Sequence, residues 1–361
     1  MPRFALLPTR GISSGDGWHF AAGCCFGGSK RAAAARCVRA AGGRRTFASS
    51  TTPPRFGGGS SSPTATTTAG TGDASQTAAS MEKAAAAIRE AKAVLICAGA
   101  GMGVDSGLPD FRGNEGFWRA YPAMRDKDIT FVEMANPRWF DDNPELALGF
   151  YGHRMNMYRR VPPHAGFSVL LDIVKQKDNN YFIFTSNVDG HFQKAGFDDN
   201  KIVEYHGSIH HWQCHTHCNK RNQIWDASHI NIAVDEEEMT AFEPFPDCPH
   251  CSDLPRPNIL MFDDKGWIPR RTRQQQLLYD KWLKQIREDK VPLVILEFGA
   301  GNSVPTVRYN SEFTVSVLRP HAKLVRVNRW ESQVPYNSED YIAVESGALQ
   351  ALLALRSLLQ L

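Results

Sequence analysis

The sequence predicts an α/β fold built on a doubly wound parallel sheet. Short, continuous apolar runs alternate with longer segments of helical pattern, and such runs are typical of parallel strands that are buried on both faces. A long polar stretch with four cysteines, 207–264, interrupts the alternation, so we expect a small inserted module there. The runs that predict strands are Ala93–Ala98, Tyr181–Thr185, Ile202–Tyr205, Val291–Phe298, Lys323–Val327 and Tyr341–Val344.

The first 74 residues predict a leader and linker ahead of the folded domain. Residues 1–72 hold nine basic residues and one acid, whereas the remainder of the chain holds 32 basic and 37 acidic residues. The segment 49–72 is a Ser/Thr/Gly/Pro linker that cannot form a core. This composition favours an organellar transit peptide, mitochondrial before plastid. A disordered extension, or a gene start at Met81 and a cytoplasmic protein, are the alternatives.

We expect the folded domain to span residues 75–361 and to begin with a helix at 78–91. Apolar residues make up 42% of the 361 residues, which is enough for one large or two modest cores. No run approaches the 18 apolar residues of a membrane span, so we expect no membrane partner. The net charge of +3 lacks the strong basic excess of dedicated nucleic-acid binders.

The first predicted strand runs into a glycine-rich turn, Gly99-Ala100-Gly101-Met102-Gly103. Glycine permits a close approach of backbone to a ligand, and a turn that opens a helix can present N–H groups to a pyrophosphate. The third glycine of the Rossmann dinucleotide motif would fall at Val104, so that motif is incomplete. The turn by itself leaves nucleotide binding and a tight structural turn both open.

The residues after this turn extend it to a long ordered motif, ending in Ser106-Gly-Leu-Pro-Asp110-Phe111-Arg112-Gly113. The whole stretch resembles the sirtuin motif Gly-Ala-Gly-x-Ser-x-x-Ser-Gly-Ile-Pro-Asp-Phe-Arg-Gly, with Gly103 in place of Ser and Leu108 in place of Ile. Arg112 offers a bidentate donor to phosphate oxygens. The resemblance implies a Rossmann-like fold and NAD contacts from Gly99, Ala100, Gly101, Asp110, Phe111 and Arg112.

Two further motifs follow the second and third predicted strands. Thr185-Ser186-Asn187-Val-Asp189-Gly190 is similar to the family's Thr-Gln-Asn-Ile-Asp-Gly, with Ser186 in place of Gln and His191-Phe192 in place of Leu-His. The resemblance places Ser186 at the cofactor, Asn187 at the nicotinamide ribose and Asp189 at the carboxamide; without it, these residue types predict an N-cap and turn. Glu204-Tyr205-His206-Gly207-Ser208 is similar to Glu-Leu-His-Gly-Ser, which makes His206 the expected general base and Asn187 its catalytic neighbour.

Three later segments extend the resemblance. Gly299-Ala300-Gly301 resembles the Gly-Thr-Ser loop along the cofactor, and Asn328 ends a segment like the one that reaches the adenosine ribose. The segment from Arg256 to Asp264, with Phe262, resembles the extended stretch that pairs with the substrate peptide. Asp263 stands there where the family has Gly, in a stretch that needs backbone freedom.

Two closely spaced cysteine pairs, Cys214/Cys218 and Cys248/Cys251, are separated by 29 residues. This pattern predicts a closed, four-coordinate structural zinc site. The first pair has one residue more than the usual spacing, which leaves His215 or His217 as an alternative ligand, and disulfides as a rival. Cys97 is expected to be a buried apolar residue, and the other cysteines, which carry no recognisable role, are Cys24, Cys25 and Cys37.

Tyr151 and Arg154 are three residues apart in a segment of helical pattern, so they share one helix face. The pair resembles the Tyr-x-x-Arg of the sirtuin branch that removes succinyl, malonyl and glutaryl groups. Arginine is the preferred bidentate partner of a carboxylate, and a Tyr hydroxyl adds a donor. The alternative is a solvated Arg beside Arg159 and Arg160.

The resemblance implies an NAD-dependent protein-lysine deacylase of the transferase class, acting on acylated protein lysines. NAD⁺ and an Nε-acyl-lysine would give nicotinamide, free lysine and O-acyl-ADP-ribose, with NAD as a consumed co-substrate and zinc as a structural ion. The substitutions Gly103, Ser186 and Asp263 leave two alternatives open, a mono-ADP-ribosyltransferase and a non-catalytic NAD-binding sensor or scaffold. A redox dehydrogenase is disfavoured because no hydride-transfer residues accompany the incomplete Rossmann turn.

Overall fold

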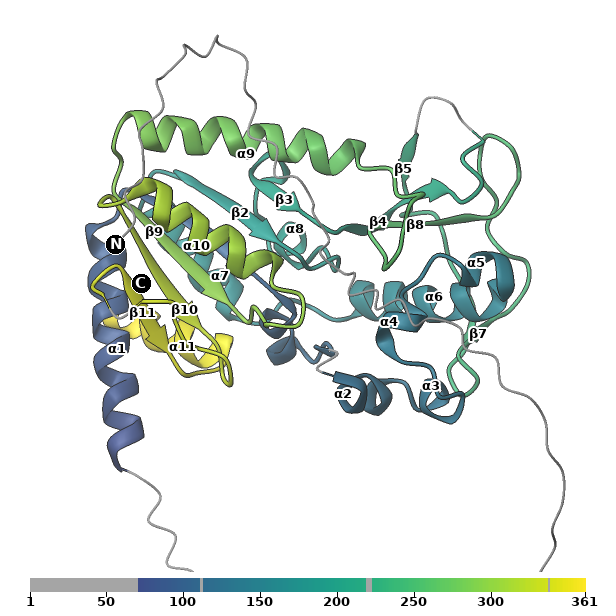
Figure 1. Cartoon of the computed structure of the whole chain (residues 1–361), viewed down its shortest axis with the longest axis horizontal. Helices are drawn as coiled ribbons and strands as arrows, with labels where there is room; N and C mark the ends of the chain where they lie inside the picture. The colour runs from purple at the N-terminus through teal and green to yellow at the C-terminus, as the bar shows by residue number, and fades with distance from the viewer. Residues whose placement is uncertain (1–70, 111–112, 219–222, 337) are drawn as a thin grey trace, which may run out of the picture. The chain divides into compact units, whose positions relative to one another are not determined.

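The computed structural model in Figure 1 describes residues 71–110, 113–218, 223–336 and 338–361. Its centre is a six-stranded parallel sheet in the order β11-β10-β9-β1-β2-β3, which confirms the predicted fold class. The predicted strands all form, with ends shifted by at most two residues. Their bounds are β1 Ala93–Ala98, β2 Tyr181–Thr185, β3 Ile202–Glu204, β9 Leu293–Phe298, β10 Ala322–Val327 and β11 Tyr341–Val344.

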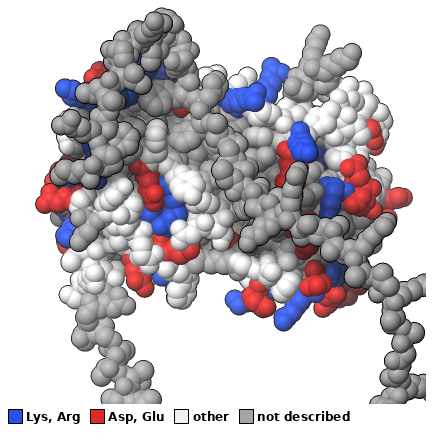
Figure 2. All heavy atoms as spheres, viewed as in Figure 1, with Lys and Arg blue, Asp and Glu red and all other residues white. Residues whose placement is uncertain are grey.

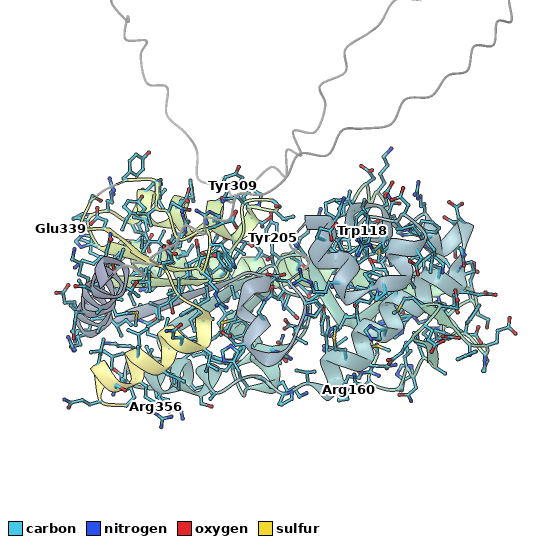
Figure 3. The ribbon with its side chains drawn as sticks, turned by 90° about the horizontal axis from the view of Figure 1, so that it is seen from below. Trp118, Arg160, Tyr205, Tyr309, Glu339 and Arg356 are labelled. Atoms are coloured by element: carbon cyan, nitrogen blue, oxygen red, sulfur yellow. The ribbon has the colours of Figure 1, made fainter. Side chains whose placement is uncertain are left out.

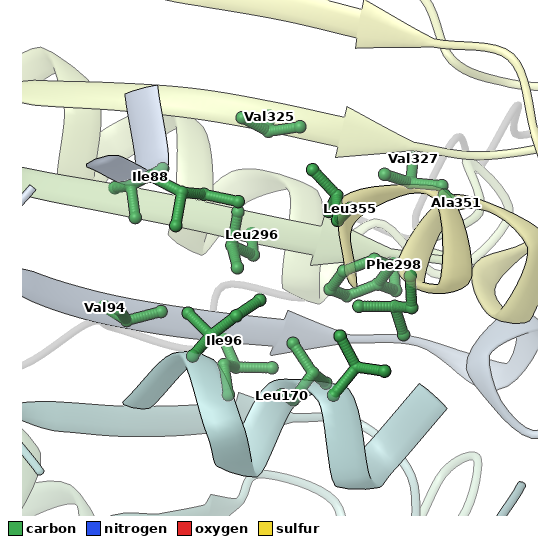
Figure 4. Packing of buried hydrophobic residues seen from close by; sticks show 14 of the residues in the cluster. Ile88, Val94, Ile96, Leu170, Leu296, Phe298, Val325, Val327, Ala351 and Leu355 are labelled. Carbon is green, nitrogen blue, oxygen red and sulfur yellow. The ribbon is translucent and has the colours of Figure 1, made fainter. Parts of the chain in front are cut away.

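Helices cover both faces of this sheet. Alternate residues of a strand point to opposite faces, so Val94 and Ile96 of β1 pack toward one helical layer and Leu95 and Cys97 toward the other. Figure 4 shows the first of these cores, where Ile96 lies among side chains of the covering helices and of β9 and β10. The first layer comprises α1 (Thr71–Glu90), α7 (Gly166–Lys175) and α11 (Ala348–Leu359), and the second α9 (Arg270–Glu288) and α10 (Thr306–Leu318). Helix α1 begins seven residues earlier than the sequence predicted.

A smaller lobe is built from two insertions into the strand–helix alternation. Buried residues of both insertions, such as Phe117, Phe150, Trp212 and Ile259, form one common core. In Figure 3 this lobe lies beside the sheet and its helices. Its helices are α2 (Gly113–Ala120), α3 (Pro122–Asp126), α4 (Phe131–Met134), α5 (Trp139–Asp142) and α6 (Pro144–Arg160), and its strands are β4 (Gly207–Cys214), β5 (Ile224–Asp226), β6 (Val234–Asp235), β7 (Thr240–Ala241) and β8 (Pro255–Ile259).

The sequence predicted only the second of these insertions as a separate module. The segment expected at 207–264 forms an antiparallel sheet β5-β4-β8 and the small β6–β7 pair. It shares its core with the helical insertion at 113–160, so the two insertions fold as one lobe. The short connections α8 (His191–Lys194) and η3 (Asp199–Lys201) join β2 to β3, and η1 (Ala100–Met102) and η2 (Val104–Ser106) follow β1.

The parallel register places the ends of neighbouring strands side by side. Ala98 pairs with Thr185 of β2 and with Phe298 of β9, while Phe298 pairs with Val327 of β10. Thr185 in turn pairs with Glu204 of β3. The loops that follow these strands therefore meet at one edge of the sheet, which is where open α/β sheets bind ligands.

The helices and the surface charges bear on possible membrane contact and charged partners. Among the described residues, no helix combines the length and the apolar character that crossing a bilayer requires. On the face shown in Figure 2, basic and acidic side chains of the described residues are interspersed and do not form one broad patch of either sign. The leader predicted at 1–74 lies outside the described residues up to position 70.

Candidate active site and metal centre

The two glycine-rich loops contact each other through their backbones. The Gly101 N–H donates to the Gly299 carbonyl over 3.0 Å. A Cβ at Gly101 would lie 2.7 Å from Gly299 Cα, and a Cβ at Gly99 would lie 2.7 Å from the Gly299 carbonyl oxygen. Gly299 itself has a φ of 59°, which side chains rarely adopt. The glycines are therefore required for this close contact, and together they form a narrow backbone cradle at the carboxyl edge of the sheet.

Asn187 links the end of β2 to this cradle. Its Nδ2 donates to the Gly99 carbonyl over 3.0 Å, and its backbone N–H donates to Thr185 Oγ1 over 3.0 Å. The backbone N–H of Ser186 donates to the Ala98 carbonyl over 3.2 Å. These bonds fix Asn187 directly beside the first glycine-rich turn.

Asp189 is held in the turn that its residue type predicts in the absence of a ligand. The residue is 8% exposed, and its Oδ1 accepts a hydrogen bond from the backbone N–H of His191 over 2.9 Å. Its carbonyl oxygen lies 2.9 Å from His210 Nε2. In this structure the carboxylate caps a turn, and its contact with the carboxamide of a cofactor stays a prediction.

His206 follows β3 and is half-buried at the same edge. Its Nε2 lies 3.3 Å from Oγ1 of Thr306, the first residue of α10, and its carbonyl accepts from the Leu260 N–H over 2.9 Å. Burial lowers the pKa of His206 to about 4, below the near-neutral value expected of a general base. The imidazole is therefore neutral at physiological pH, and in this structure it is a weaker base than the near-neutral histidine that the sequence predicted.

Asn328 fixes the loops that follow β9 and β10. Its buried Nδ2 donates to the Ala300 carbonyl over 3.0 Å, and its Oδ1 accepts from the N–H groups of Trp330 and Glu331, each over 3.0 Å. Ala300 is buried, and the half-buried Gly301 follows it. Asn328 thus holds the second glycine-rich loop in place, and its predicted contact with a ribose remains untested.

The four predicted metal ligands converge. The Sγ atoms of Cys214, Cys218, Cys248 and Cys251 all lie within 4.8 Å of one another. Two of the separations are 3.8 Å (Cys214 to Cys251) and 3.7 Å (Cys218 to Cys248). Four thiolates at about 2.3 Å from a tetrahedral Zn²⁺ lie about 3.8 Å apart, so donor set and spacing fit a structural zinc ion.

Among the described residues, the cysteines form no disulfide, and the cluster of possible metal ligands contains no histidine. All five cysteines among the described residues are free thiols, and Cys97 is buried in β1 as predicted. His215 Nε2 lies 2.9 Å from Asp141 Oδ1, so this ring is engaged elsewhere. His217 lies beside Gly266, where a Cβ would meet its Nε2 at 2.7 Å.

Helix α6 places Tyr151 and Arg154 together, as the spacing predicted, but inside the lobe. Tyr151 is fully buried, and Arg154 is 6% exposed, so Arg154 is not a solvated side chain. The Arg154 guanidinium lies over the rings of Phe150, Tyr151 and Tyr158 at 5.3, 5.7 and 5.5 Å, and its NH2 donates to the Tyr158 hydroxyl over 3.0 Å. Although burial opposes the charge, the surrounding Tyr hydroxyls raise the pKa of Arg154.

A profile of the Sir2 family, the sirtuins, matches residues 99–276 of this sequence. This range contains the first glycine-rich turn, Asn187, His206 and all four clustered cysteines. The chain belongs to the Sir2 family.

Curated relatives of this sirtuin chain are described as NAD-dependent protein deacylases. The one from Thermococcus kodakarensis is 29% identical over 192 residues, which cover 53% of this chain and 67% of the relative. The one from Pyrococcus furiosus is 31% identical over 166 residues, covering 46% of this chain and 59% of the relative. The chain thus matches about three fifths to two thirds of the length of these relatives.

Solved sirtuin structures share the fold. One described as the structural basis for the mechanism and regulation of Sir2 enzymes has a TM-score of 0.55 at 21% identity, covering 78% of this chain and 98% of that chain. A Sir2 homologue in complex with NAD has a TM-score of 0.54 at 21% identity, covering 77% of this chain and 94% of that chain.

Two departures from the sirtuin motifs have a local explanation in this chain. A Cβ at Gly103 would lie 3.2 Å from Leu108 Cδ1, so a larger residue would crowd the Leu that replaces Ile. Asp263 has a φ of 55°, in the left-handed region that a Gly adopts freely and that Asp tolerates. The Gly-to-Asp replacement therefore keeps the bend.

The segment predicted to pair with a substrate peptide is fixed at both ends. The N–H of Phe262 donates to the Ala135 carbonyl over 2.8 Å, and its ring lies edge-on to Phe131. Asp264 forms a bidentate buried ion pair with Arg256, with both N–O distances at 2.8 Å. The segment therefore joins the two insertions of the smaller lobe.

Two predicted contacts cannot be placed, and some residues of the site were not predicted. Phe111 and Arg112 lie outside the described residues, while Asp110 is half-buried just before them. Two residues of the site were not predicted from the sequence: Thr306, which contacts His206, and Arg308, which contacts the loop at Ala300. Neither residue belongs to a motif, and only their position after the second glycine-rich loop could have pointed to them.

Proposed function

We propose that this chain is an NAD-dependent protein-lysine deacylase. The observation that supports it is the arrangement at the carboxyl edge of the sheet, where Asn187 is bonded to the glycine cradle and His206 to the first residue of α10. The Sir2 family profile covers Asn187 and His206, and sirtuin relatives described as NAD-dependent protein deacylases match about half of the chain. The proposed partner is an acylated lysine of a protein.

The cradle and its neighbours fit a dinucleotide. Because no side chain projects where Gly99, Gly101 and Gly299 meet, the two loops pack closely at the carboxyl edge of the sheet, which is where open α/β sheets bind ligands. When bound, NAD supplies the nicotinamide–ribose bond that is broken as the acyl oxygen attacks the ribose carbon. The chain orients the reactants before this step, since the cradle is held by hydrogen bonds within the protein.

His206 is the group that would accept the ribose proton. Its imidazole is neutral because burial lowers its pKa to about 4, and its Nε2 lies within reach of the Thr306 hydroxyl. If this hydroxyl donates to Nε2, a proton leaving a ribose hydroxyl can pass through Thr306 or displace it. Asn187 stays beside Gly99 and positions the ribose end of the site.

Zinc serves the structure of the smaller lobe. Cys214 ends β4, and Cys248 and Cys251 precede β8, so an ion held by these residues ties together the two strands that pair in the lobe. The cluster is the metal site that the described residues offer, and it is built from thiolates, which suit a closed structural site.

We also infer that the preferred acyl group ends in a carboxylate. Tyr151 and Arg154 are buried on one face of α6, and the hydroxyl of Tyr151 has no hydrogen-bond partner within the described structure. The Arg154 guanidinium lies 5.7 Å from the centre of the Tyr151 ring, and both side chains carry hydrogen-bond donors that a carboxylate would accept.

For the leader we propose import into an organelle, the mitochondrion before the plastid. The support is compositional, since residues 1–72 combine nine basic residues with one acid. A fluorescent protein fused to residues 1–74 should concentrate in that organelle. Diffuse cytosolic fluorescence would contradict the proposal.

The catalytic proposal is tested by nicotinamide release. Purified protein with NAD and a panel of acetyl- and succinyl-lysine peptides should release nicotinamide only when an acyl-peptide is present. His206→Ala should keep the fold and lower the rate roughly 10²–10⁴-fold, as expected for the loss of a positioned general base. Release without any peptide dependence would point to the ADP-ribosyltransferase, and no release with any peptide would point to a sensor or scaffold.

A further inference from the structure

A buried cluster of charged side chains lies between the sheet and α10, outside the motifs of the active site. Glu297 of β9 and Arg326 of β10 are fully buried, and Arg308 of α10 is 7% exposed. Charged groups are rarely placed in a core unless each is paired, because desolvation disfavours them strongly. The partners of these residues therefore indicate what the cluster holds together.

Arg326 is fixed on three sides. Its guanidinium pairs with Glu297 through two nitrogens and with Glu312 of α10 over 2.7 Å. Its remaining nitrogen, NH1, donates to the Gln333 carbonyl over 2.8 Å. Arg326 therefore anchors the segment after β10 to the core.

Arg308 reaches both loops at the carboxyl edge of the sheet. Its NH1 donates to the Glu331 carbonyl over 2.8 Å and to the Ala300 carbonyl over 3.3 Å. Its NH2 donates to the Gln333 carbonyl over 2.9 Å. One guanidinium thus joins the second glycine-rich loop to the segment 331–333. We refer to Arg308 and Arg326 together as the arginine clamp.

The arginine clamp connects directly to the glycine cradle. Ala300, which accepts from Arg308, also accepts from Asn328 and follows Gly299, whose carbonyl accepts from Gly101. The backbone N–H and the side-chain amide of Asn302 donate to the Glu331 carboxylate, over 3.3 and 2.7 Å. The position of the cradle against the first turn therefore depends on how firmly the loop at 299–302 is held.

The arginine clamp borders a cavity. Arg308 and Arg326 line a cavity of about 380 Å³ together with Asn302, Glu312 and Gln333. The guanidinium of Arg308 is therefore positioned by its hydrogen bonds to backbone carbonyls, and that of Arg326 by its ion pairs with Glu297 and Glu312. Tyr309, the next residue along α10, lines the same cavity, but it is 64% exposed and lies at the outer edge of the molecule (Figure 3).

We propose that Arg308 is a positioning residue for the dinucleotide. It fixes the loop at 299–302 and the segment 331–333 against each other, so that the cradle is formed before NAD binds. This inference rests on the proposed function for the identity of the ligand. Arg308 acts through the backbone carbonyls that it holds and is not itself a catalytic residue.

The test compares Arg308→Met with wild type and with Tyr309→Ala as the matched control from the same cavity. We expect Arg308→Met to weaken NAD binding about 10-fold or more in titration calorimetry, because charge-assisted bonds to three carbonyls are lost. KM for NAD should rise by a similar factor, while KM for the acyl-peptide stays within about twofold. Amide hydrogen exchange should accelerate at 299–302 and 331–333, and Tyr309→Ala should change none of these quantities.

The conservative variant and the contrary results complete the test. Arg308→Lys keeps a cation that can reach one or two of the carbonyls, so its affinity for NAD should lie between those of Arg308→Met and wild type. If Arg308→Met does not fold, Arg308→Lys takes its place in every measurement. Unchanged NAD affinity in the folded variant, or an equal rise in KM for both substrates, would overturn the inference and leave the proposed function standing. A wild-type chain that does not bind NAD would overturn both.

Discussion

The contact between the two glycine-rich loops gives a quantitative prediction for Gly101→Ala. The added Cβ would lie 2.7 Å from Gly299 Cα and 3.0 Å from the Gly299 carbonyl oxygen, whereas ordinary contacts begin at about 3.4 Å. Both neighbours are backbone atoms, and Gly299 is further held by the bond from its N–H to the Val327 carbonyl. The strain cannot be relieved by rotating a side chain, so the loop itself has to move.

The expected loss of stability follows from three terms. Overpacking costs about 1–3 kcal/mol, the bond from Gly101 to Gly299 contributes about 1 kcal/mol, and replacing Gly by Ala returns about 0.4–1 kcal/mol through the unfolded state. The free energy of unfolding should therefore fall by about 2 kcal/mol. For a folded domain of about 290 residues, whose entropy of unfolding is about 0.6 kcal/mol/K, that lowers the Tm by roughly 3 °C.

Gly301→Ala is the matched control for stability. A Cβ there would lie 3.4 Å from Glu331 Oε2, the end of a flexible side chain, so its Tm should stay within about 1 °C of wild type. Differential scanning calorimetry measures both Tm values, and titration with NAD should show at least a tenfold loss of affinity for Gly101→Ala. A Gly101→Ala chain as stable as Gly301→Ala, with wild-type affinity for NAD, would refute the reasoning.

Three further predictions concern the metal, pH and the acyl group. Metal analysis of the purified protein should find one zinc per chain. The Cys248→Ser variant should lose this zinc, and its thermal unfolding should show that the whole fold is destabilised. A wild-type preparation that is metal-free, well folded and active would contradict this prediction. The pKa of His206 is about 4 in the folded chain and about 6.5 in the unfolded chain. Between pH 6.5 and pH 4 the unfolded chain therefore binds a proton at His206 that the folded chain does not bind. The free energy of unfolding thus decreases as the pH falls from 6.5 to 4. His206→Gln should remove part of this fall, up to the order of 3 kcal/mol, and wild-type kcat/KM should show no acid limb near pH 6.5; equal pH slopes for the two chains would contradict the assignment. Arg154→Met should lower succinyl-lysine turnover far more than acetyl-lysine turnover. Arg160 is an exposed residue of the same helix, so Arg160→Met should change neither turnover. Equal slowing of both substrates by Arg154→Met would disprove the acyl-pocket assignment.

The central sheet could be predicted because each of its strands is a continuous apolar run. Ala93–Ala98 and Tyr181–Thr185 are buried at every position, so their boundaries coincide with the ends of the apolar runs. The smaller lobe was predicted only in part. Its core joins Phe117 and Phe150 of one insertion to Trp212 and Ile259 of the other, and local patterns do not report contacts between segments so far apart in the chain.

The site could be predicted where a motif includes the residue and not where only packing places it. The motifs led to Asn187, His206 and the four cysteines, which the structure brings to one sheet edge and one cluster. The sequence did not show that burial lowers the pKa of His206 to about 4, since this depends on the surrounding fold. Thr306 and Arg308 belong to no motif, and their contacts arise only when α10 packs against the sheet.

The most direct test of the proposed function is the identity of the product formed from NAD. Mass spectrometry of a reaction with an acyl-lysine peptide should show one O-acyl-ADP-ribose and one nicotinamide for each lysine freed, and none of these products with the unacylated peptide. ADP-ribose attached to protein, or NAD and peptide left intact under conditions where the protein is folded and holds zinc, would contradict the assignment of this chain as a deacylase.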